Sequence, residues 1–259
     1  MFIFGMGYSA KYIAAAMRDA GWRVTGTGSD GDIAFDDADG VAQAIAAADY
    51  ILSSIPPDDG SDPALDRYGE RLGGKRLGYL SSTGVYGDCD GAWVDESAPI
   101  GGGRRSARAD CDSRWLELGA QVFRLPGIYG PGGSAFERVR QGRAHRIDLP
   151  GQVFSRVHVA DIAGGVAAAV RQDAPPGAHN LGDDLPTSQN AVIEEACRLI
   201  GAEPPPLQTI EEADLSPMAR GFYAENRRVA NGKAKRVLGW APLYPTYREG
   251  LRAVLAAEA

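Results

Sequence analysis

The sequence has few of the residues that build disulfide frameworks or metal centres. Its 259 residues include three cysteines, Cys89, Cys111 and Cys197, and three histidines. Neither set has the paired spacing of a zinc site, and the cysteines are odd in number and far apart, unlike a disulfide framework. We therefore expect no metal site and a protein of the reducing cytoplasm.

The chain also lacks long apolar runs and an excess of positive charge. No stretch reaches the ~18 apolar residues that a membrane-spanning helix needs, and its first residues read as a core strand, not as a signal peptide. The net charge is −7 and the pI about 5.1, whereas nucleic-acid binding depends on clustered Lys and Arg. Aspartates dilute the one basic cluster, residues 104–114. The sequence predicts an acidic protein that binds neither nucleic acid nor a membrane.

What the first half does contain is an alternation of short apolar strands and helices. Strands are predicted at residues 2–4, 22–25, 33–35 (the weakest), 50–55, 77–82 and 121–125. Helices are predicted at residues 12–17, 41–48 and, as the end of a helix, 113–118. This alternation with short connections is typical of a parallel sheet covered by helices on both faces, and right-handed crossovers make it doubly wound. The fold class expected is therefore α/β.

A glycine turn follows the first strand and opens the first helix. Gly5-x-Gly7-x-x-Ala10 has the spacing of a dinucleotide-binding fingerprint, in the strand–turn–helix context that the fingerprint requires. The first glycine allows a tight turn, the second lets the backbone approach a pyrophosphate, and the small third residue lets the helix pack on the strand. The helix start, at Tyr8 and Ser9, supplies unpaired N–H groups to the phosphates. We expect these five residues to bind a dinucleotide on a Rossmann sheet.

The choice of cofactor depends on the end of the second strand. An acid about 20 residues after the glycines would hold the ribose hydroxyls of NAD. Here the sequence reads Gly26-Thr27-Gly28-Ser29-Asp30. The acid comes two or three positions late, and Thr27, Gly28 and Ser29 leave space and hydroxyl donors for a 2′-phosphate, which Lys11 could assist. NADP is therefore slightly favoured over NAD. The alternative is that the acid only makes the loop soluble.

After Pro126, proline and glycine interrupt the chain more often. Helices are predicted there at residues 159–170, 190–200 and 247–257. We expect residues 1–125 to form the dinucleotide-binding Rossmann core. Residues 126–259 are expected to supply the last core elements and a small C-terminal substrate lobe, within one integrated domain.

Several segments resemble the extended short-chain dehydrogenase/epimerase family, in its atypical branch. They are the glycine turn, Ser81–Asp88 (SSTGVYGD), Arg124–Gly132 (RLPGIYGPG), Arg156–Ala163 (RVHVADIA), Leu238–Pro242 (LGWAP) and Tyr247–Leu251 (YREGL). Together they span almost the whole chain. The resemblance implies an NAD(P) cofactor and a substrate that is a nucleotide sugar or another small molecule with a hydroxyl or carbonyl group. It also allows a homodimer.

The resemblance assigns roles to residues at the strand ends. The family's catalytic hydroxyl falls on Ser82, with the neighbouring Thr83 as a substitute, and would hydrogen-bond the substrate oxygen whose charge changes. The alternative for the serine pair is ordinary strand-end hydrogen bonding. Further cofactor contacts are expected from Asp36, Ser54, Ile55, Pro56, Ser81, Pro126 and Ile128. Asp36 either accepts from the adenine amine or caps the following helix.

The family's catalytic pair, a Tyr followed four residues later by a Lys, is absent. No Tyr-x-x-x-Lys occurs, and the corresponding positions hold Arg104 and Arg108. Arg108 can keep the contact to the nicotinamide ribose, but neither guanidinium can shuttle a proton because its pKa lies above ~12. Both arginines either bind a substrate anion or lie exposed. Candidates for a replacement acid are Tyr129, Tyr223, Asp88, Asp95, Glu96 and His158. For His158 and Asp161, capping or packing is the commoner explanation.

Three hypotheses remain open from the sequence. The first is an NAD(P)-dependent enzyme of epimerase/dehydratase or reductase type. The second is a non-catalytic NAD(P)-binding redox sensor or regulatory partner, favoured by the missing pair. The third is a Rossmann-like protein with a different ligand, such as a methyltransferase-type fold, and the motifs above speak against it.

Overall fold

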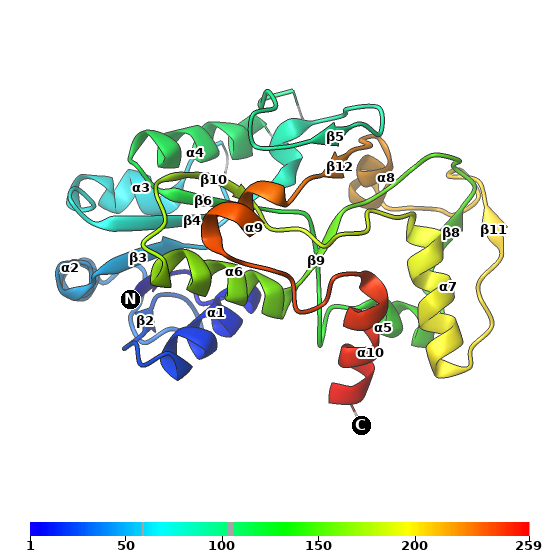
Figure 1. Ribbon diagram of the computed structural model, residues 1–259, viewed down its shortest axis with the longest axis horizontal. Helices are drawn as coiled ribbons and strands as arrows, with labels where there is room; N and C mark the ends of the chain where they lie inside the picture. Colours follow the sequence, from blue (N-terminus) through cyan, green and yellow to red (C-terminus); the bar gives the residue numbers. More distant parts are fainter. Residues whose placement is uncertain (59, 103–105, 259) are drawn as a thin grey trace.

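The structure is a computed structural model that describes residues 1–58, 60–102 and 106–258. At its centre lies a parallel six-stranded sheet in the order β10-β6-β4-β3-β1-β2 (Figure 1). Its strands are β1 (Phe2–Phe4), β2 (Thr25–Gly26), β3 (Tyr50–Ser53), β4 (Arg76–Ser82), β6 (Gln121–Leu125) and β10 (Gly177–Asn180). The chain winds outward from β1 in both directions. The predicted α/β fold with a doubly wound parallel sheet is confirmed.

Helices cover both faces of the sheet because successive strand residues point to opposite sides. Ile3 faces a cluster formed with α1 (Tyr8–Asp19) and α6 (Val159–Arg171). Phe2 and Phe4 face the opposite cluster, formed with α2 (Ala38–Ala47), α3 (Pro63–Tyr68) and α4 (Ser106–Glu117). Figure 1 shows α1 and α6 on one side of the sheet, and α3 and α4 on the other.

The second and third predicted strands differ from the prediction. The strand expected at residues 22–25 is β2, which covers only Thr25–Gly26, and residues 33–35 form no strand beyond one bridge between Thr27 and Ile33. The cause is a turn in which the backbone N–H of Asp32 donates to the carbonyl of Gly26 (2.8 Å) and the Asp32 carboxylate accepts from the Gly26 N–H (3.1 Å). This turn uses the backbone groups that a longer strand would have paired.

The second half of the chain adds a lobe beside the sheet (Figure 1). Its helices α5 (Ala135–Arg140), α7 (Gln189–Ile200) and α10 (Tyr247–Ala257) share a third apolar cluster. The other helices here are α8 (Pro217–Tyr223) and α9 (Gly232–Leu238), while η1 (Gly69–Arg71) and η2 (Thr83–Tyr86) are 3₁₀ turns of the first half. Three parallel pairs complete the structure: β7 (Gly127–Tyr129) with β9 (Arg156–His158), β5 (Trp93–Val94) with β12 (Arg228–Val229), and β8 (Arg146–Ile147) with β11 (Leu207–Gln208).

A buried polar network joins β4, α4, β6 and β10. Arg124 donates from Nε and Nη2 to both carboxylate oxygens of Asp112 (3.0 and 2.7 Å), and from Nη1 to the Tyr86 hydroxyl (3.0 Å). Ser81 donates to Asp112 (2.6 Å), and Tyr86 donates to Asn180 (2.7 Å). Two of the motifs that resemble the family, those containing Ser81 and Arg124, therefore meet in one structural network.

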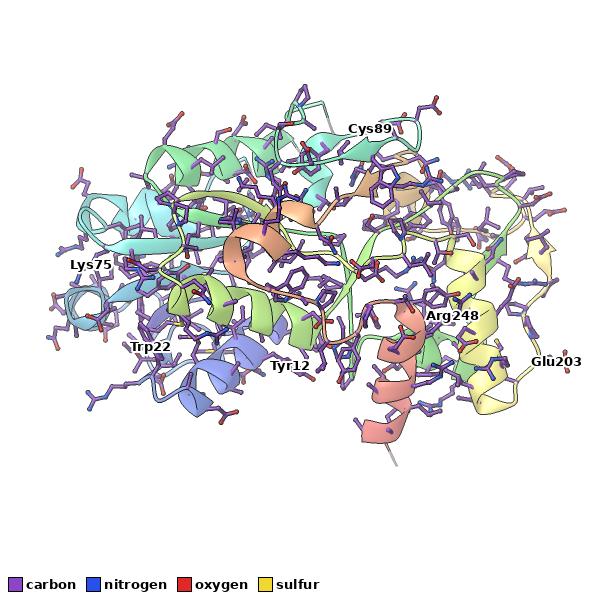
Figure 2. The ribbon with its side chains drawn as sticks, viewed as in Figure 1. Tyr12, Trp22, Lys75, Cys89, Glu203 and Arg248 are labelled. Carbon is purple, nitrogen blue, oxygen red and sulfur yellow. The ribbon has the colours of Figure 1, made fainter. Side chains whose placement is uncertain are left out.

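The cysteine side chains are free thiols. Cys111 and Cys197 are buried, whereas Cys89 is half-buried in the loop between η2 and β5 (Figure 2). Among the described residues, no helix is both long and apolar enough to cross a membrane.

Candidate functional site

A cleft of about 800 Å³ lies at the carboxyl ends of the central strands. Ser54 follows β3, Ser82 ends β4 and Leu125 ends β6, and all three line it together with Gly7 after β1. The lobe supplies the opposite wall. This is where open parallel sheets bind ligands, because the loops after the strands leave a crevice at the point where strand order reverses.

The glycine turn has the geometry of a phosphate cradle. Gly5 has φ +83°, and a Cβ there would lie 2.8 Å from Cγ1 of Ile55. A Cβ on Gly7 would meet no atom within 4 Å, so the space above this residue is open. The Ser54 hydroxyl donates to the Gly5 carbonyl (2.5 Å), and the Gly5 N–H donates to the Thr27 hydroxyl (3.1 Å). The side chains around the turn therefore fix its shape.

The start of α1 leaves its first N–H groups for a ligand. Gly7 is the N-cap and provides no side-chain cap, and the first turn contains no acidic residue. Unpaired N–H groups and the helix dipole favour an anion at this place. The Tyr8 hydroxyl donates to the carbonyl of Pro131 (2.9 Å), which ties the helix start to the loop after β7.

Two residues of the predicted cofactor set are buried beside the turn. Thr27 is fully buried and its hydroxyl accepts from the Gly5 N–H, so it helps to fix the turn, and its contact to a 2′-phosphate stays a prediction. Ala10 is also buried, where it packs in the core against α6. Lys11, expected to assist with the phosphate, forms an ion pair with Asp30 (2.5 Å) in which both side chains are about half exposed.

Asp36 does not cap α2. The cap is its neighbour Asp37, whose carboxylate accepts from the Gly40 N–H (3.0 Å). The Asp36 carboxylate is exposed and accepts from Arg67 (2.7 Å). One of the two alternatives for Asp36 is therefore wrong, and the contact to adenine stays a prediction.

The structure brings ten of the predicted site residues to the cleft. They are Gly7, Tyr8, Ser9, Ser54, Ser81, Ser82, Thr83, Arg108, Pro126 and Ile128. Eight others do not line it: Gly5, Ala10, Thr27, Gly28, Ser29, Asp36, Ile55 and Pro56. Arg104 lies outside the described residues.

The two serines at the end of β4 make different bonds. Ser81 donates its hydroxyl proton to Asp112, so it belongs to the buried network. The Ser82 hydroxyl accepts from the Gly84 N–H (3.1 Å) and caps η2. An accepting hydroxyl still has its proton to donate. Ser82 can therefore make the strand-end bond and still donate a hydrogen bond into the cleft.

Arg108 lies beside these serines. Its Nη1 donates to the Tyr79 hydroxyl (3.0 Å) and to the carbonyl of Leu80 (3.4 Å). Its Nε is buried and has no partner among the described residues. The guanidinium is thus held against β4 at the cleft wall, with donor capacity unused.

Of the candidates for a replacement acid, only Tyr129 and Tyr223 line the cleft. The carboxylates of the other candidates accept from backbone N–H groups instead: Asp88 from Asn226 (2.8 Å), Asp95 from Ser97 (2.9 Å) and Glu96 from Asn180 (2.7 Å). The structure therefore does not bring these three carboxylates to the cleft.

His158 and Asp161 serve the fold at the start of α6. Nδ1 of His158 accepts from the Ala160 N–H (3.2 Å), and burial lowers the His158 pKa to about 4, so the ring is neutral. The Asp161 carboxylate accepts from the N–H groups of Leu243 (2.5 Å) and Tyr244 (3.2 Å). Burial raises the Asp161 pKa to about 6. Both contacts agree with the capping and packing explanation.

Sequence reasoning missed the charged wall that the lobe contributes. Arg138, Arg156, Arg227 and Glu225 line the cleft with the aromatic ring of Phe154. Arg156 opens one of the motifs that resemble the family, but nothing in the pattern indicated that its side chain faces a ligand site. The others lie in segments without a recognisable motif.

Comparison with known proteins shows that this chain has a relative of similar sequence and structure. A structure from Silicibacter pomeroyi, described as a functionally unknown conserved protein, shares 38% identity, covers 99% of this chain and 98% of its own, and has a TM-score of 0.88. The two chains belong to one family. No family model matches the sequence.

Solved structures of lower identity show the fold. The human epimerase family protein SDR39U1 with NADPH is 15% identical, with a TM-score of 0.77 over 99% of both chains. The Thermus thermophilus UDP-glucose 4-epimerase in complex with NAD is 18% identical, with a TM-score of 0.71 over 99% of this chain and 98% of its own. This chain therefore has the same fold as these two structures, the α/β fold that the sequence predicted.

One curated relative is named for a reaction. The 3-diazoavenalumate denitrifying reductase of a Streptomyces species is 31% identical over 179 residues. The match covers 61% of this chain and 58% of the relative, so it spans little more than half of the reductase.

Proposed function

We propose that this protein binds NADP or NAD and catalyses a reaction of the epimerase or reductase type on a small molecule with a hydroxyl or carbonyl group. One observation carries the proposal. A single cleft connects the open glycine turn at Gly7 with Ser82 and Arg108, so a bound dinucleotide and a hydroxyl donor share one space. The human and Thermus structures of the same fold hold NADPH and NAD, and the Streptomyces relative is named a reductase.

The residues present fit a dinucleotide. The uncapped start of α1 and the empty space above Gly7 suit the pyrophosphate, because a backbone without a side chain allows close approach. Arg108 takes the ribose contact that the family's lysine makes. When bound, the nicotinamide would supply or accept a hydride. Ser82 donates a hydrogen bond to the substrate oxygen as its charge changes.

The lining of the cleft favours an enzyme over a redox sensor. Groups that can hold a proton line it: the phenols of Tyr8, Tyr129, Tyr223 and Tyr247, and the carboxyl of Glu225. A cleft with only arginines and apolar side chains would instead favour the non-catalytic alternative, since guanidinium groups cannot transfer a proton at ordinary pH. We further propose that residues 1–125 form the dinucleotide-binding core, that residues 126–259 supply the last core elements and the substrate lobe, and that the protein works in the cytoplasm.

The direct test is separate titration with NADPH and NADH, followed by protein fluorescence or calorimetry. We expect both to bind, with NADPH tighter. Lys11→Ala should weaken NADPH more than NADH, because only NADPH carries the 2′-phosphate that could draw Lys11 away from Asp30. Arg18→Ala, on the same helix, is the matched control and should change neither affinity. Failure of both dinucleotides to bind at millimolar concentration would refute the proposed function.

A turnover test separates the enzyme from the sensor. Purified protein with NADPH is screened against aldehydes, ketones and nucleotide sugars, and cofactor oxidation or product formation is followed. Ser82→Ala should abolish any turnover while leaving NADPH affinity within about twofold, because its hydroxyl faces the substrate oxygen. Equal turnover by this variant would contradict the role of Ser82.

A further inference from the structure

The charge of the cleft differs in sign from the charge of the whole protein. The chain carries a net charge of −7, yet the described residues that line the cleft include four arginines and a single carboxylate, Glu225. A cleft of one sign with low-dielectric walls concentrates ligands of the opposite sign. The position of each arginine decides where such a ligand would lie.

Two of the four arginines are engaged near the sheet. Arg108 is held by Tyr79 at the end of β4. Nη1 of Arg227 donates to Oε2 of Glu225 (2.8 Å) and to the carbonyl of Gly87 (2.6 Å). Both guanidinium groups are thus held by neighbouring protein oxygens.

Arg156 is different because its charge is buried and makes no ion pair with any residue that the structure describes. Arg156 is only 7% exposed. The guanidinium donates to four neutral oxygens: the carbonyls of Phe154 (2.9 Å), Thr187 (3.0 Å) and Ser188 (3.4 Å), and Oε1 of Gln189 (3.0 Å). Within the described ranges, no carboxylate lies within 4.0 Å of it. The carboxyl of Asp183 is close enough to interact with the Arg156 charge, but burial raises the Asp183 pKa to about 7. Buried charges are normally paired, and Asp183 balances this one only in part.

Arg138 lies at the same end of the cleft. It is exposed on α5, and its guanidinium makes no ion pair with any residue that the structure describes. Both arginines lie near the phenol of Tyr223: burial raises the Tyr223 pKa, and the charges of Arg138 and Arg156 oppose that rise. The ring of Tyr223 packs edge-on against Phe154 at 5.4 Å, and Cζ of Arg156 lies 5.8 Å from the centre of the Phe154 ring. Two positive charges and two aromatic rings therefore meet at the lobe end.

We propose that the lobe end of the cleft binds the carboxylate of a compact aromatic acid, which is the substrate of the reaction proposed above. The carboxylate lies between Arg138 and Arg156. Arg138 binds it through paired, charge-assisted hydrogen bonds, whereas the Nη groups of Arg156 already donate to protein oxygens, so Arg156 contributes its positive charge. The ring packs against Phe154 and Tyr223. The nicotinamide half of the dinucleotide must share the cleft of about 800 Å³, which leaves room for a compact second ligand.

The proposal is tested by calorimetric titration with three probes, each in the absence and presence of saturating NADPH. The probes are 4-hydroxycinnamate, its neutral amide, and UDP-glucose. We expect 4-hydroxycinnamate to bind at least about tenfold more tightly than the amide, because only the acid makes charge-assisted bonds to Arg138 and is attracted by the charge of Arg156. Its affinity should fall as salt rises. Equal affinity for acid and amide, or binding of UDP-glucose alone, would overturn the proposal.

The position of the site is tested with a matched pair of variants on α5. Arg138→Met should weaken 4-hydroxycinnamate about tenfold or more and leave NADPH affinity unchanged. Arg140→Met removes the next exposed arginine of the helix, which pairs with Glu258 and does not line the cleft, and should leave both affinities unchanged. An unaltered affinity of the Arg138 variant would refute the placement. Failure of the proposed function shows separately, as loss of NADPH binding by the wild-type protein.

Discussion

The Asp183→Asn variant measures how much the buried carboxylate of Asp183 lowers the free energy of unfolding. Asp183 is 3% exposed, and its Oδ2 has no hydrogen-bond partner among the described residues. Its Oδ1 accepts from the Leu185 N–H at 3.3 Å. Burial raises the Asp183 pKa from 3.8 to about 7, and the nearby charge of Arg156 opposes that rise only in part. The folded protein therefore favours the protonated carboxyl.

The sign and size of the effect follow from this pKa. Because the folded pKa lies above the unfolded pKa, the stabilisation is complete below pH 4 and is lost as the pH rises to about 7. A rise of about three pH units corresponds to roughly 4 kcal/mol, at 1.36 kcal/mol per unit. Asparagine keeps the shape and stays neutral. The free energy of unfolding of Asp183→Asn should match that of the wild type below pH 4 and exceed it by about 4 kcal/mol above pH 7.

The assay is urea unfolding of both proteins at pH 4, 5, 6, 7 and 8, followed by circular dichroism. The buried histidines His158 and His179, whose pKa values burial lowers to about 4, titrate in both proteins and cancel in the difference. Asp184→Asn is the control: this neighbour is half exposed and pairs with Lys235 (2.5 Å), so its replacement should change stability by less than about 1 kcal/mol. A difference between Asp183→Asn and the wild type that does not vary with pH would refute the reasoning.

Three further substitutions test other parts of the structure. Arg124→Met should destabilise the protein by about 3–5 kcal/mol in urea unfolding, because it leaves the Asp112 carboxylate buried without its partner; a loss under about 1 kcal/mol would contradict the network. Gly7→Val should abolish NADPH binding in a titration and keep the wild-type melting temperature, since a Cβ there meets no protein atom; retained binding would move the cofactor site elsewhere. Gly250→Ala should cost about 1–3 kcal/mol, read as a lower melting temperature, because its Cβ would overlap the ring of Tyr129; an unchanged melting temperature would show that the ring can move aside.

Much of the fold could be predicted because its signals are local. The apolar strands and the helices between them appear in the sequence as short runs and helical stretches, and α10 has the predicted bounds, 247–257. The short β2 could not be predicted in the same way. Its end depends on a side-chain bond from Asp32 back to Gly26, and the apolar run at residues 33–35 packs in the core without forming a strand. Composition cannot distinguish these outcomes.

The residues of the candidate site also differ in how far the sequence could predict them. The glycine turn could be recognised because its spacing after a strand follows a known fingerprint, whereas the resemblance to the family pointed to Ser82. Thr27 was assigned to the cofactor because its residue type suits a phosphate, and residue type could not show that it is buried and that its hydroxyl accepts from the Gly5 N–H. Arg138 and Arg227 lie 89 residues apart in the chain and reach one cleft only through the packing of the lobe. No spacing in the sequence predicts a meeting of that kind.

The strand order also bears on how the chain folds while it is being made. The edge strand β10 pairs with β6, yet it comes about 55 residues later in the sequence. At about 5–20 residues per second, the outer edge of β6 stays unpaired for several seconds after its synthesis. Unpaired edges readily bind strands of other chains. Slower growth at low temperature should change the yield of soluble protein, because it changes how long this edge stays unpaired. A nascent chain that ends before residue 177 lacks β10 and should depend on chaperones.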